Sequence, residues 1–251
     1  MSTASTKAAR RGLAAILGFV CLACAGVPRG ADPQEGKGGV AGMTGDLSGI
    51  DHVIVGINDL QRGIEELERL TGVRAVYGGA HPGRGTHNAL ISLGGSQYLE
   101  ILSPNPEDEG SSPWIGGLEK LTSLTPVGWA ARSDDLAALQ QTLKGQGIET
   151  GEIRPGARNQ PDGTRLAWRT LGLTAPSFLL PFFIEWDPAT AHPSQTTPKG
   201  CRLTGFTLHD PAPDTLRKPL QAAGLGVEVL NDQKSGIRIS LACLKGEVEL
   251  R

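Results

Sequence analysis

The sequence predicts an α+β fold made of repeated β-α-β-β-β units. Three times the chain shows a short apolar stretch, a capping Asp or Asn, an amphipathic stretch and a closing glycine. Asp and Asn side chains satisfy the free N–H groups that begin a helix, and glycine commonly ends one. Asp59, Asp135 and Asp214, which precede or begin the three amphipathic stretches, lie 76 and 79 positions apart. Such regular spacing of similar units indicates internal duplication.

The first unit opens with an apolar strand over residues 50–57, followed by Asn58-Asp59 and a helix that ends near Gly72. Leu60, Ile64 and Leu67 give this helix a single apolar face. Three further strands are expected over residues 74–77, 87–93 and 97–102.

The second and third units repeat this order. The second has a strand at 127–132, a helix with Leu136, Leu139 and Leu143 on one face, and strands near 149–153, 165–171 and 182–186. The third has a strand at 203–208, a helix with Leu216 and Leu220, and strands near 226–230, 237–242 and 247–250. Pro219 removes a helical hydrogen bond, so the third helix is expected to be short or to begin late.

The N-terminus is typical of an export signal. Lys7, Arg10 and Arg11 precede an uncharged run over residues 12–25, which is too short for a comfortable transmembrane helix. Residues 23–25 fit a signal peptidase site, whereas Leu22-Ala23-Cys24 is similar to a lipoprotein signal that would attach a lipid to Cys24. A retained amphipathic anchor is the remaining alternative. We therefore expect residues 1–25 to be a leader and the protein to be exported, either periplasmic or anchored to the membrane as a lipoprotein.

Residues 26–48 are rich in glycine and have little to bury, which is typical of a flexible linker. The chain has 24 Lys and Arg against 26 Asp and Glu, so it lacks the basic footprint of a nucleic-acid-binding protein. It also lacks a glycine-rich nucleotide loop, a Gly-x-Ser-x-Gly elbow and a His-Glu-x-x-His motif, which argues against a nucleotide cofactor, a serine hydrolase and a zincin.

The opening Ile50-Asp51-His52-Val53 and the closing Tyr98-Leu99-Glu100-Ile101 of the first unit resemble the vicinal oxygen chelate superfamily. The stretch from His81 to Leu90 (HPGRGTHNAL) and the stretch from Leu180 to Trp186 (LPFFIEW) resemble its glyoxalase-like branch. The resemblance implies that residues 49–193 form two paired units whose curved sheets enclose a cup. Residues 199–251 look like a third, degenerate unit.

The resemblance also implies that metal ligands come from the first and fourth strands of each unit. His52 and Glu100 meet that expectation, and Glu185 matches Glu100 when the units are aligned. These three side chains suit a divalent ion such as Zn²⁺, Fe²⁺, Mn²⁺ or Ni²⁺. Gly128 stands where a fourth ligand is expected, so a site that no longer holds metal fits equally well. His52 and Glu100 could also be ordinary structural or solvated residues.

Four further residues are candidates for substrate binding. Arg84 offers bidentate recognition of a carboxylate or phosphate, and His87 is expected to face the cup from the third strand. Arg158 and Trp168 are placed on the opposite wall. The alternative is a hairpin loop at residues 81–87 whose glycines serve turn geometry alone.

Two functions follow from these assignments. The first is a metal-assisted lyase, isomerase or dioxygenase that acts on a small oxygenated compound, with Glu185 or Glu100 moving a proton. The second is a non-catalytic module of the same fold that binds or sequesters a small molecule. No nucleic-acid partner is expected, membrane contact is expected only through a lipid on Cys24, and a homodimer is compatible with both functions.

Cys201 and Cys243 are expected to stay unpaired. The first and third strands of the last unit are expected to run parallel, which places the two cysteines at opposite ends of the sheet, roughly 20 Å apart.

Overall fold

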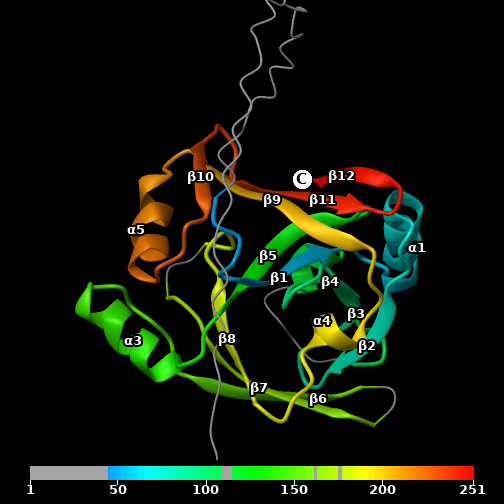
Figure 1. The fold of residues 1–251 in the computed structure, drawn as a ribbon, viewed down its shortest axis with the longest axis horizontal. Coiled ribbons are helices and arrows are strands. Elements are labelled where there is room, and N and C mark those ends of the chain that lie inside the picture. The colour runs from blue at the N-terminus through cyan, green and yellow to red at the C-terminus, as the bar shows by residue number, and fades with distance from the viewer. Residues whose placement is uncertain (1–44, 109–114, 161–162, 175–176) are drawn as a thin grey trace, which may run out of the picture. The chain divides into compact units, whose positions relative to one another are not determined.

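The computed structural model describes residues 45–108, 115–160, 163–174 and 177–251 (Figure 1). The expected leader, residues 1–25, and the expected linker up to residue 44 lie outside the described residues. Residues 45–48 already belong to the folded body, because Asp46 donates its backbone N–H to Gly226 and Leu47 packs against the hydrophobic core. The folded body therefore begins earlier than the predicted residue 49.

An eight-stranded sheet carries the first two units. In chain order its strands are β1 (Ile50–Gly56), β2 (Val76–His81), β3 (Thr86–Ser92), β4 (Tyr98–Pro104), β5 (Thr125–Arg132), β6 (Arg154–Asn159), β7 (Arg165–Leu171) and β8 (Phe182–Trp186), and their spatial order is β2-β3-β4-β1-β5-β8-β7-β6. In each unit the first strand pairs in parallel with the fourth, and the antiparallel pair β1–β5 joins the units. The predicted pairing of two units is thus confirmed.

The main helices of the two paired units cover the convex face of this sheet. α1 (Leu60–Thr71) and α3 (Leu136–Gly145) begin after Asp59 and Asp135, whose side chains accept hydrogen bonds from first-turn N–H groups as predicted. α1 ends at Gly72, whose left-handed φ of 79° favours glycine. Two four-residue helices, α2 (Ile115–Leu118) and α4 (Pro193–Thr196), were not expected from the sequence.

The last unit has the predicted element order but a different strand pairing. It comprises β9 (Cys201–Asp210), α5 (Asp214–Ala222), β10 (Glu228–Asn231), β11 (Gly236–Cys243) and β12 (Gly246–Leu250), in the spatial order β10-β9-β11-β12. Its first strand pairs in parallel with the second strand and antiparallel with the third. α5 contains Pro219 and is the shortest of the three unit helices, with nine residues.

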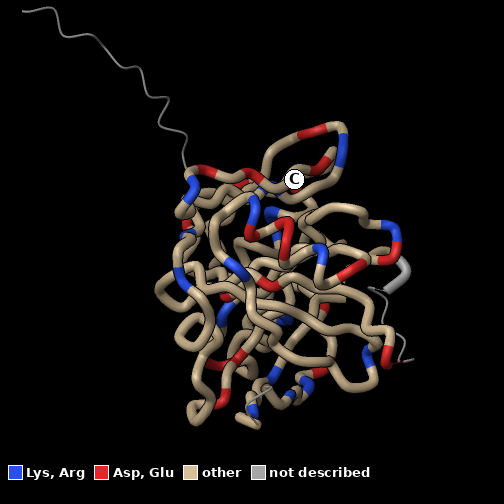
Figure 2. The backbone as a smooth tube through the Cα atoms, turned by 90° about the vertical axis from the view of Figure 1, so that its right-hand side faces the viewer, with Lys and Arg blue, Asp and Glu red and all other residues tan. Residues whose placement is uncertain are grey.

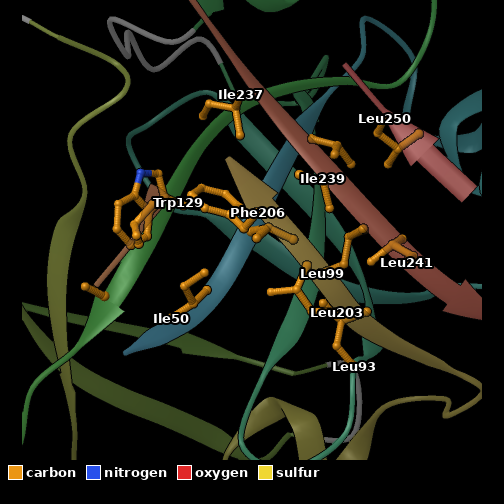
Figure 3. Packing of buried hydrophobic residues seen from close by; sticks show 14 of the residues in the cluster. Ile50, Leu93, Leu99, Trp129, Leu203, Phe206, Ile237, Ile239, Leu241 and Leu250 are labelled. Carbon is orange, nitrogen blue, oxygen red and sulfur yellow. The ribbon is translucent and has the colours of Figure 1, made fainter. Parts of the chain in front are cut away.

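The small sheet packs against the convex face of the large one (Figure 3). Phe206 and Ile239 lie between the sheets, and the ring centroids of Phe206 and Trp129 are 5.0 Å apart. These side chains are almost fully buried, so the last unit seals the back of the large sheet with apolar surface.

The prediction for the cysteines was wrong. Cys201 and Cys243 form a disulfide, and their Cα atoms lie 4.1 Å apart. β9 and β11 run antiparallel with these two residues directly opposite each other, whereas the prediction assumed parallel strands. Because the strands are antiparallel, the start of β9 lies beside the end of β11, and the two cysteines meet there.

The two edge strands of the large sheet, β2 and β6, approach each other and nearly close it. A Cβ atom built on Gly79 would lie 2.9 Å from the backbone oxygen of Asn159, and one on Gly78 would lie 2.7 Å from an Arg158 side-chain nitrogen. Residues without side chains are needed at this close approach. In both paired units, the strand predicted directly after the helix was placed too early. The predictions were residues 74–77 and 149–153, whereas the structure has β2 and β6.

Charged residues of both signs are interspersed along the backbone in the view of Figure 2. Within the described part of the chain, no helix is long and apolar enough to cross a membrane.

Candidate functional site

The concave face of the large sheet encloses a cavity of about 540 Å³, which we call the cup. Alternate residues of each strand point to this face, so both paired units contribute side chains. The first unit supplies His52, Ile54, His81, Arg84, Asn88, Tyr98, Glu100 and Leu102, and the second supplies Arg154, Arg158, Trp168, Phe182, Ile184 and Trp186.

His52 lies on β1, and a β-bulge fixes its environment. Ile50 pairs with Ala131 and His52 with Ala130, so Asp51 is an extra residue without an opposite partner. A bulge interrupts the alternation of side chains and redirects one of them. The Asp51 carboxylate consequently reaches its neighbour, with Oδ1 2.8 Å from His52 Nδ1.

Asp51 is fully buried and anchors several groups. Its Oδ2 lies 3.1 Å from His192 Nε2 and accepts a hydrogen bond of 3.2 Å from Trp186 Nε1, and Arg132 Nε is 3.6 Å away. Burial opposes ionisation, but the hydrogen bonds and charges of His192 and His52 lower the pKa of Asp51 well below its usual range. Asp51 is therefore an ionised, well-satisfied carboxylate.

These contacts also fix the tautomers of both histidines. His192 Nδ1 accepts a hydrogen bond from the backbone N–H of Ser194, so Nε2 carries the proton donated to Asp51. An ionised carboxylate only accepts, so His52 donates from Nδ1. The other ring nitrogen of His52, Nε2, faces the cup.

Glu100 on β4 faces that nitrogen. Its Oε2 lies 3.6 Å from His52 Nε2, and its Oε1 lies 3.6 Å from His81 Nε2 and accepts a hydrogen bond of 2.6 Å from Asn88 Nδ2. Burial raises the pKa of Glu100, but the charges of His81 and His52 and the Asn88 bond outweigh it and lower the pKa. Glu100 is thus ionised beside the His52 ring.

His81 completes this side of the cup. Its Nδ1 lies 2.9 Å from Thr86 Oγ1 and its Nε2 lies 3.2 Å from Asn88 Nδ2. Burial lowers the pKa of His81, and the charge of Glu100 only partly offsets this effect.

Arg158 brings a buried positive charge from β6. Its side chain crosses to the first unit, where Nη1 donates a hydrogen bond of 2.5 Å to Asn88 Oδ1. Asn88 therefore links the Arg158 guanidinium to the Glu100 carboxylate, and one polar network spans the two paired units.

Aromatic rings surround this network. Tyr98 stacks on His52 at a centroid distance of 4.4 Å, and Phe182 meets the same ring edge-on at 5.6 Å. Trp168 and Trp186 lie 5.4 Å apart on the opposite wall. The Trp168 indole lies against Gly156, where a Cβ atom would come within 2.4 Å of Nε1. Mainly apolar walls around a few placed polar groups are typical of small-molecule sites.

Five of the predicted site residues line the cup and two do not. His52, Glu100, Arg84, Arg158 and Trp168 all line it. Glu185 and His87 lie on strand faces that point away from it.

The prediction that Glu185 faces the cup was wrong, because the alternation of side chains along β8 is shifted by one residue from the predicted one. Phe182, Ile184 and Trp186 of β8 line the cup, so Glu185 points to the convex side. There its Oε2 accepts a hydrogen bond of 2.9 Å from the Leu136 N–H, at the start of α3, and its Oε1 pairs with Arg169. Glu185 is thus a helix-capping residue.

The predicted position of His87 was wrong for the same reason. Thr86 and Asn88 line the cup, so His87 points to the other face with Ala89 and Ile91 of the core. There its ring meets Tyr77 edge-on, with centroids 6.1 Å apart.

The glycines of the loop at residues 82–85 do not hold a ligand. The backbone N–H groups of Gly83 and Gly85 both donate to Asp108 Oδ2, at 3.1 and 3.3 Å. Both glycines have positive φ, of 70° and 62°, so the turn itself requires them. Pro82 and the exposed Arg84 of this loop line the cup.

Sequence reasoning missed Asp51, His81 and Asn88 as site residues. Strict alternation assigns Asp51 and His52 to opposite faces, and no sequence signal marks the bulge that brings them together. Asn88 could have been found, because it stands two residues after Thr86 on a strand whose other face is apolar.

The predicted divalent metal centre does not fit the residues present. Of its three ligands, only His52 and Glu100 lie in the cup, and His81 is held by Thr86 and Asn88. Within the described residues, no three His, Cys, Asp or Glu side chains are grouped to hold a metal ion. The Arg158 guanidinium already supplies positive charge to the network that contains Glu100.

A sequence profile of the family described as "glyoxalase-like domain" matches residues 50–224. The chain therefore belongs to the glyoxalase-like domain family, which confirms the resemblance to the vicinal oxygen chelate superfamily. No curated protein matches the sequence.

Solved structures are similar to this chain in fold. A hypothetical protein from Staphylococcus aureus, 16% identical, has a TM-score of 0.57 over 80% of this chain and 98% of its own. A methylmalonyl-CoA epimerase from Mycobacterium tuberculosis, 24% identical, has a TM-score of 0.42 over 56% of this chain and 89% of its own. A methylmalonyl-CoA epimerase from Streptomyces coelicolor, 20% identical, has a TM-score of 0.40 over 58% of this chain and 99% of its own.

Proposed function

We propose that the protein is an enzyme of the isomerase or lyase class that moves a proton on a small oxygenated compound without a metal ion. One observation carries this proposal: His52, held by the buried Asp51, presents Nε2 to an aromatic-walled cup 3.6 Å from the ionised Glu100. An imidazole oriented by a carboxylate is a common general base.

The reaction begins when His52 Nε2 removes a proton from a carbon next to a carbonyl group. The electron pair moves to the carbonyl oxygen, and Asp51 stabilises the imidazolium that forms. The oxyanion is stabilised by the Arg158 guanidinium. The proton is held between His52 Nε2 and Glu100 Oε2 and returns to a substrate atom, either to give an isomer or to help a leaving group depart. No oxidant or reductant is consumed.

A non-catalytic binding module is the second candidate. The second unit favours this candidate. Its counterpart of His52 is Gly128, and its fourth strand presents Ile184 to the cup instead of a carboxylate. A cup with acid–base groups on one side only could hold a ligand without transforming it.

Deuterium exchange separates the two candidates. The full chain is incubated in D₂O with a panel of β-keto, α-hydroxy and 1,2-dicarbonyl acids, and exchange is followed by NMR together with binding. Exchange into at least one member should fall by about 100-fold or more in His52→Gln. The matched control is His209→Gln, which changes a histidine of β9 outside the cup. Binding of panel members without exchange would assign the protein to the sequestering class.

Metal analysis tests the metal-free character of the site. Purified protein exposed in turn to Zn²⁺, Fe²⁺, Mn²⁺ and Ni²⁺ and then dialysed should retain clearly less than one equivalent of each. Stoichiometric metal that is lost in Glu100→Gln would restore the metal-assisted mechanism.

We also propose that the protein is exported. The uncharged run behind a basic start supports this, and the Cys201–Cys243 disulfide supports it independently, because disulfides persist mainly in oxidising compartments. Protein isolated from its native cell under non-reducing conditions should be about 2 Da lighter than the reduced chain. Free thiols in that sample would argue against export.

A further inference from the structure

The cup carries more positive than negative charge. Among the described residues that line it, three are arginines, Arg84, Arg154 and Arg158, and only Glu100 is a carboxylate. The whole chain, by contrast, has a formal net charge of −2. Concentrating arginines in one hollow of an acidic protein favours an anionic ligand.

Arg158 is the inner of the three arginines. It is only 4% exposed, yet no carboxylate of the described residues forms an ion pair with it, and its hydrogen-bond partner Asn88 is neutral. A guanidinium has five N–H groups in a fixed fork, so this one retains donors for a bound anion. Arg158 reaches the Glu100 carboxylate only through the neutral Asn88, so an anion bound directly to the guanidinium would compensate its buried charge further.

Arg84 and Arg154 lie at the solvent-exposed rim. The strand pairings make β2 and β6 antiparallel, and Gly79 of β2 lies against Asn159 at the end of β6. Arg84, in the loop after β2, is therefore at the same edge of the cup as Arg154, the first residue of β6. Arg154 has only Glu152, at 3.9 Å, as a weak exposed partner.

The cup also has apolar walls. Arg154 and Arg158 are four residues apart on one strand, which is about 13 Å. Trp168 pairs with Gly156 between these two positions, and Phe182 and Leu102 also line the cup, so these walls suit a flat hydrocarbon body.

We propose that the ligand is an organic dianion with a flat apolar body, one anionic group of which binds Arg158 while the other binds Arg84 and Arg154. That this ligand is also the substrate rests on the proposed function, whereas its binding by the arginines does not. The outer anionic group is a carboxylate or a phosphate, and both chemistries fit a pair of arginines.

A matched ligand series tests this proposal by calorimetry on the full chain. Cinnamate carries one carboxylate, 4-carboxycinnamate carries two, and 4-(phosphonooxy)cinnamate replaces the outer carboxylate by a phosphate, which adds up to one further negative charge. Both ligands with an outer anionic group should bind at least about tenfold more tightly than cinnamate at low salt, and the advantage should shrink as salt is added. A phosphate preference that persists at high salt identifies phosphate as the outer group, and its loss at high salt identifies a carboxylate.

Variants assign the two anion positions. Arg84→Gln combined with Arg154→Gln should reduce dianion affinity to that of cinnamate and leave cinnamate binding unchanged. Arg158→Lys keeps the buried charge but loses the fork and should weaken all three ligands. Arg165→Gln is the matched control, because Arg165 is an exposed arginine of β7 that does not line the cup.

Equal affinity for cinnamate and both dianions would overturn the proposal, and so would dianion binding that survives the double substitution. These results are independent of the exchange assay. Dianion binding without His52-dependent exchange would remove the proposed reaction and keep the ligand class, whereas exchange without a preference for dianions would do the opposite.

Discussion

Glu100 and Glu185 stand on the equivalent fourth strands of the two paired units, yet they serve different ends. Glu100 points into the cup between His52 and His81, whereas Glu185 points to the convex face and caps α3. The first unit thus holds the proposed acid–base groups, and the second supplies Arg158 and aromatic walls. The two units share the same strand order and pairing, while the proposed acid–base groups lie in only one of them.

The largest expected difference between the units is at Asp51, which has no counterpart at the start of β5. Asp51→Ala should lower the free energy of unfolding by about 3–5 kcal/mol, because two imidazoles and an indole lose a buried charged acceptor. Asp135→Ala, which removes the exposed cap of α3, should cost about 1 kcal/mol. Denaturant unfolding measures both changes in unfolding free energy. Equal losses would show that the buried contacts of Asp51 stabilise the fold no more than an exposed helix cap does.

The second prediction compares the two glutamates directly. Glu100→Gln should lower the exchange rate in the D₂O assay by about 100-fold or more, because the proton loses its second holder. Glu185→Gln should leave that rate unchanged. A loss of exchange in Glu185→Gln, in protein that remains folded, would return Glu185 to the site.

The third prediction concerns stability at Glu185. Glu185→Ala should lower the free energy of unfolding by about 1 kcal/mol, because the Leu136 N–H loses its acceptor. Arg169→Ala should have little effect, since its ion pair with Glu185 is exposed. A similar loss in both variants would assign the effect to the ion pair instead of the helix cap.

The β-α-β-β-β order and the caps of α1 and α3 followed from periodicity and spacing, because those features are local. The third predicted cap was wrong, since Pro213 precedes α5 without a side-chain cap bond. The pairing of two units followed from the family resemblance. Side-chain direction on a strand was harder, since it has a period of two and a slip of one residue reverses it. Glu185 was misplaced by such a slip in aligning two short strands. Asp51 was missed because a bulge, which depends on the partner strand β5, breaks the alternation.

Strand order in the last unit was equally beyond the sequence. Its elements follow the same chain order and run in the same directions as in the first unit, but β9 lies between β10 and β11 instead of beside the fourth strand. This order places Cys201 directly opposite Cys243. Element order is encoded locally, whereas pairing is decided by which apolar faces can be buried together, here against Trp129 of β5.

The smallest predicted effect is a pH dependence that belongs to the first unit. Burial lowers the pKa of His81 below its usual value of 6.5, so the unfolded chain binds a proton more readily than the folded one. Its contribution to stability is complete above about 6.5 and is lost as the pH falls. His81→Gln should flatten the decline in unfolding free energy between about pH 7 and pH 5.5. An unchanged slope would contradict this assignment. The lowered pKa values of Glu100 and Asp51 act in a more acidic range and should leave this window unaffected.

The close approach of β2 and β6 has a consequence for self-assembly. Because these margins lie against each other at Gly79 and Asn159, each restricts the approach of a second molecule to the other. Among the described strands, β10 and β12 are the ones that border open margins. If two copies of this protein associate by extending a sheet, they must do so through the C-terminal unit, and the cups would remain separate.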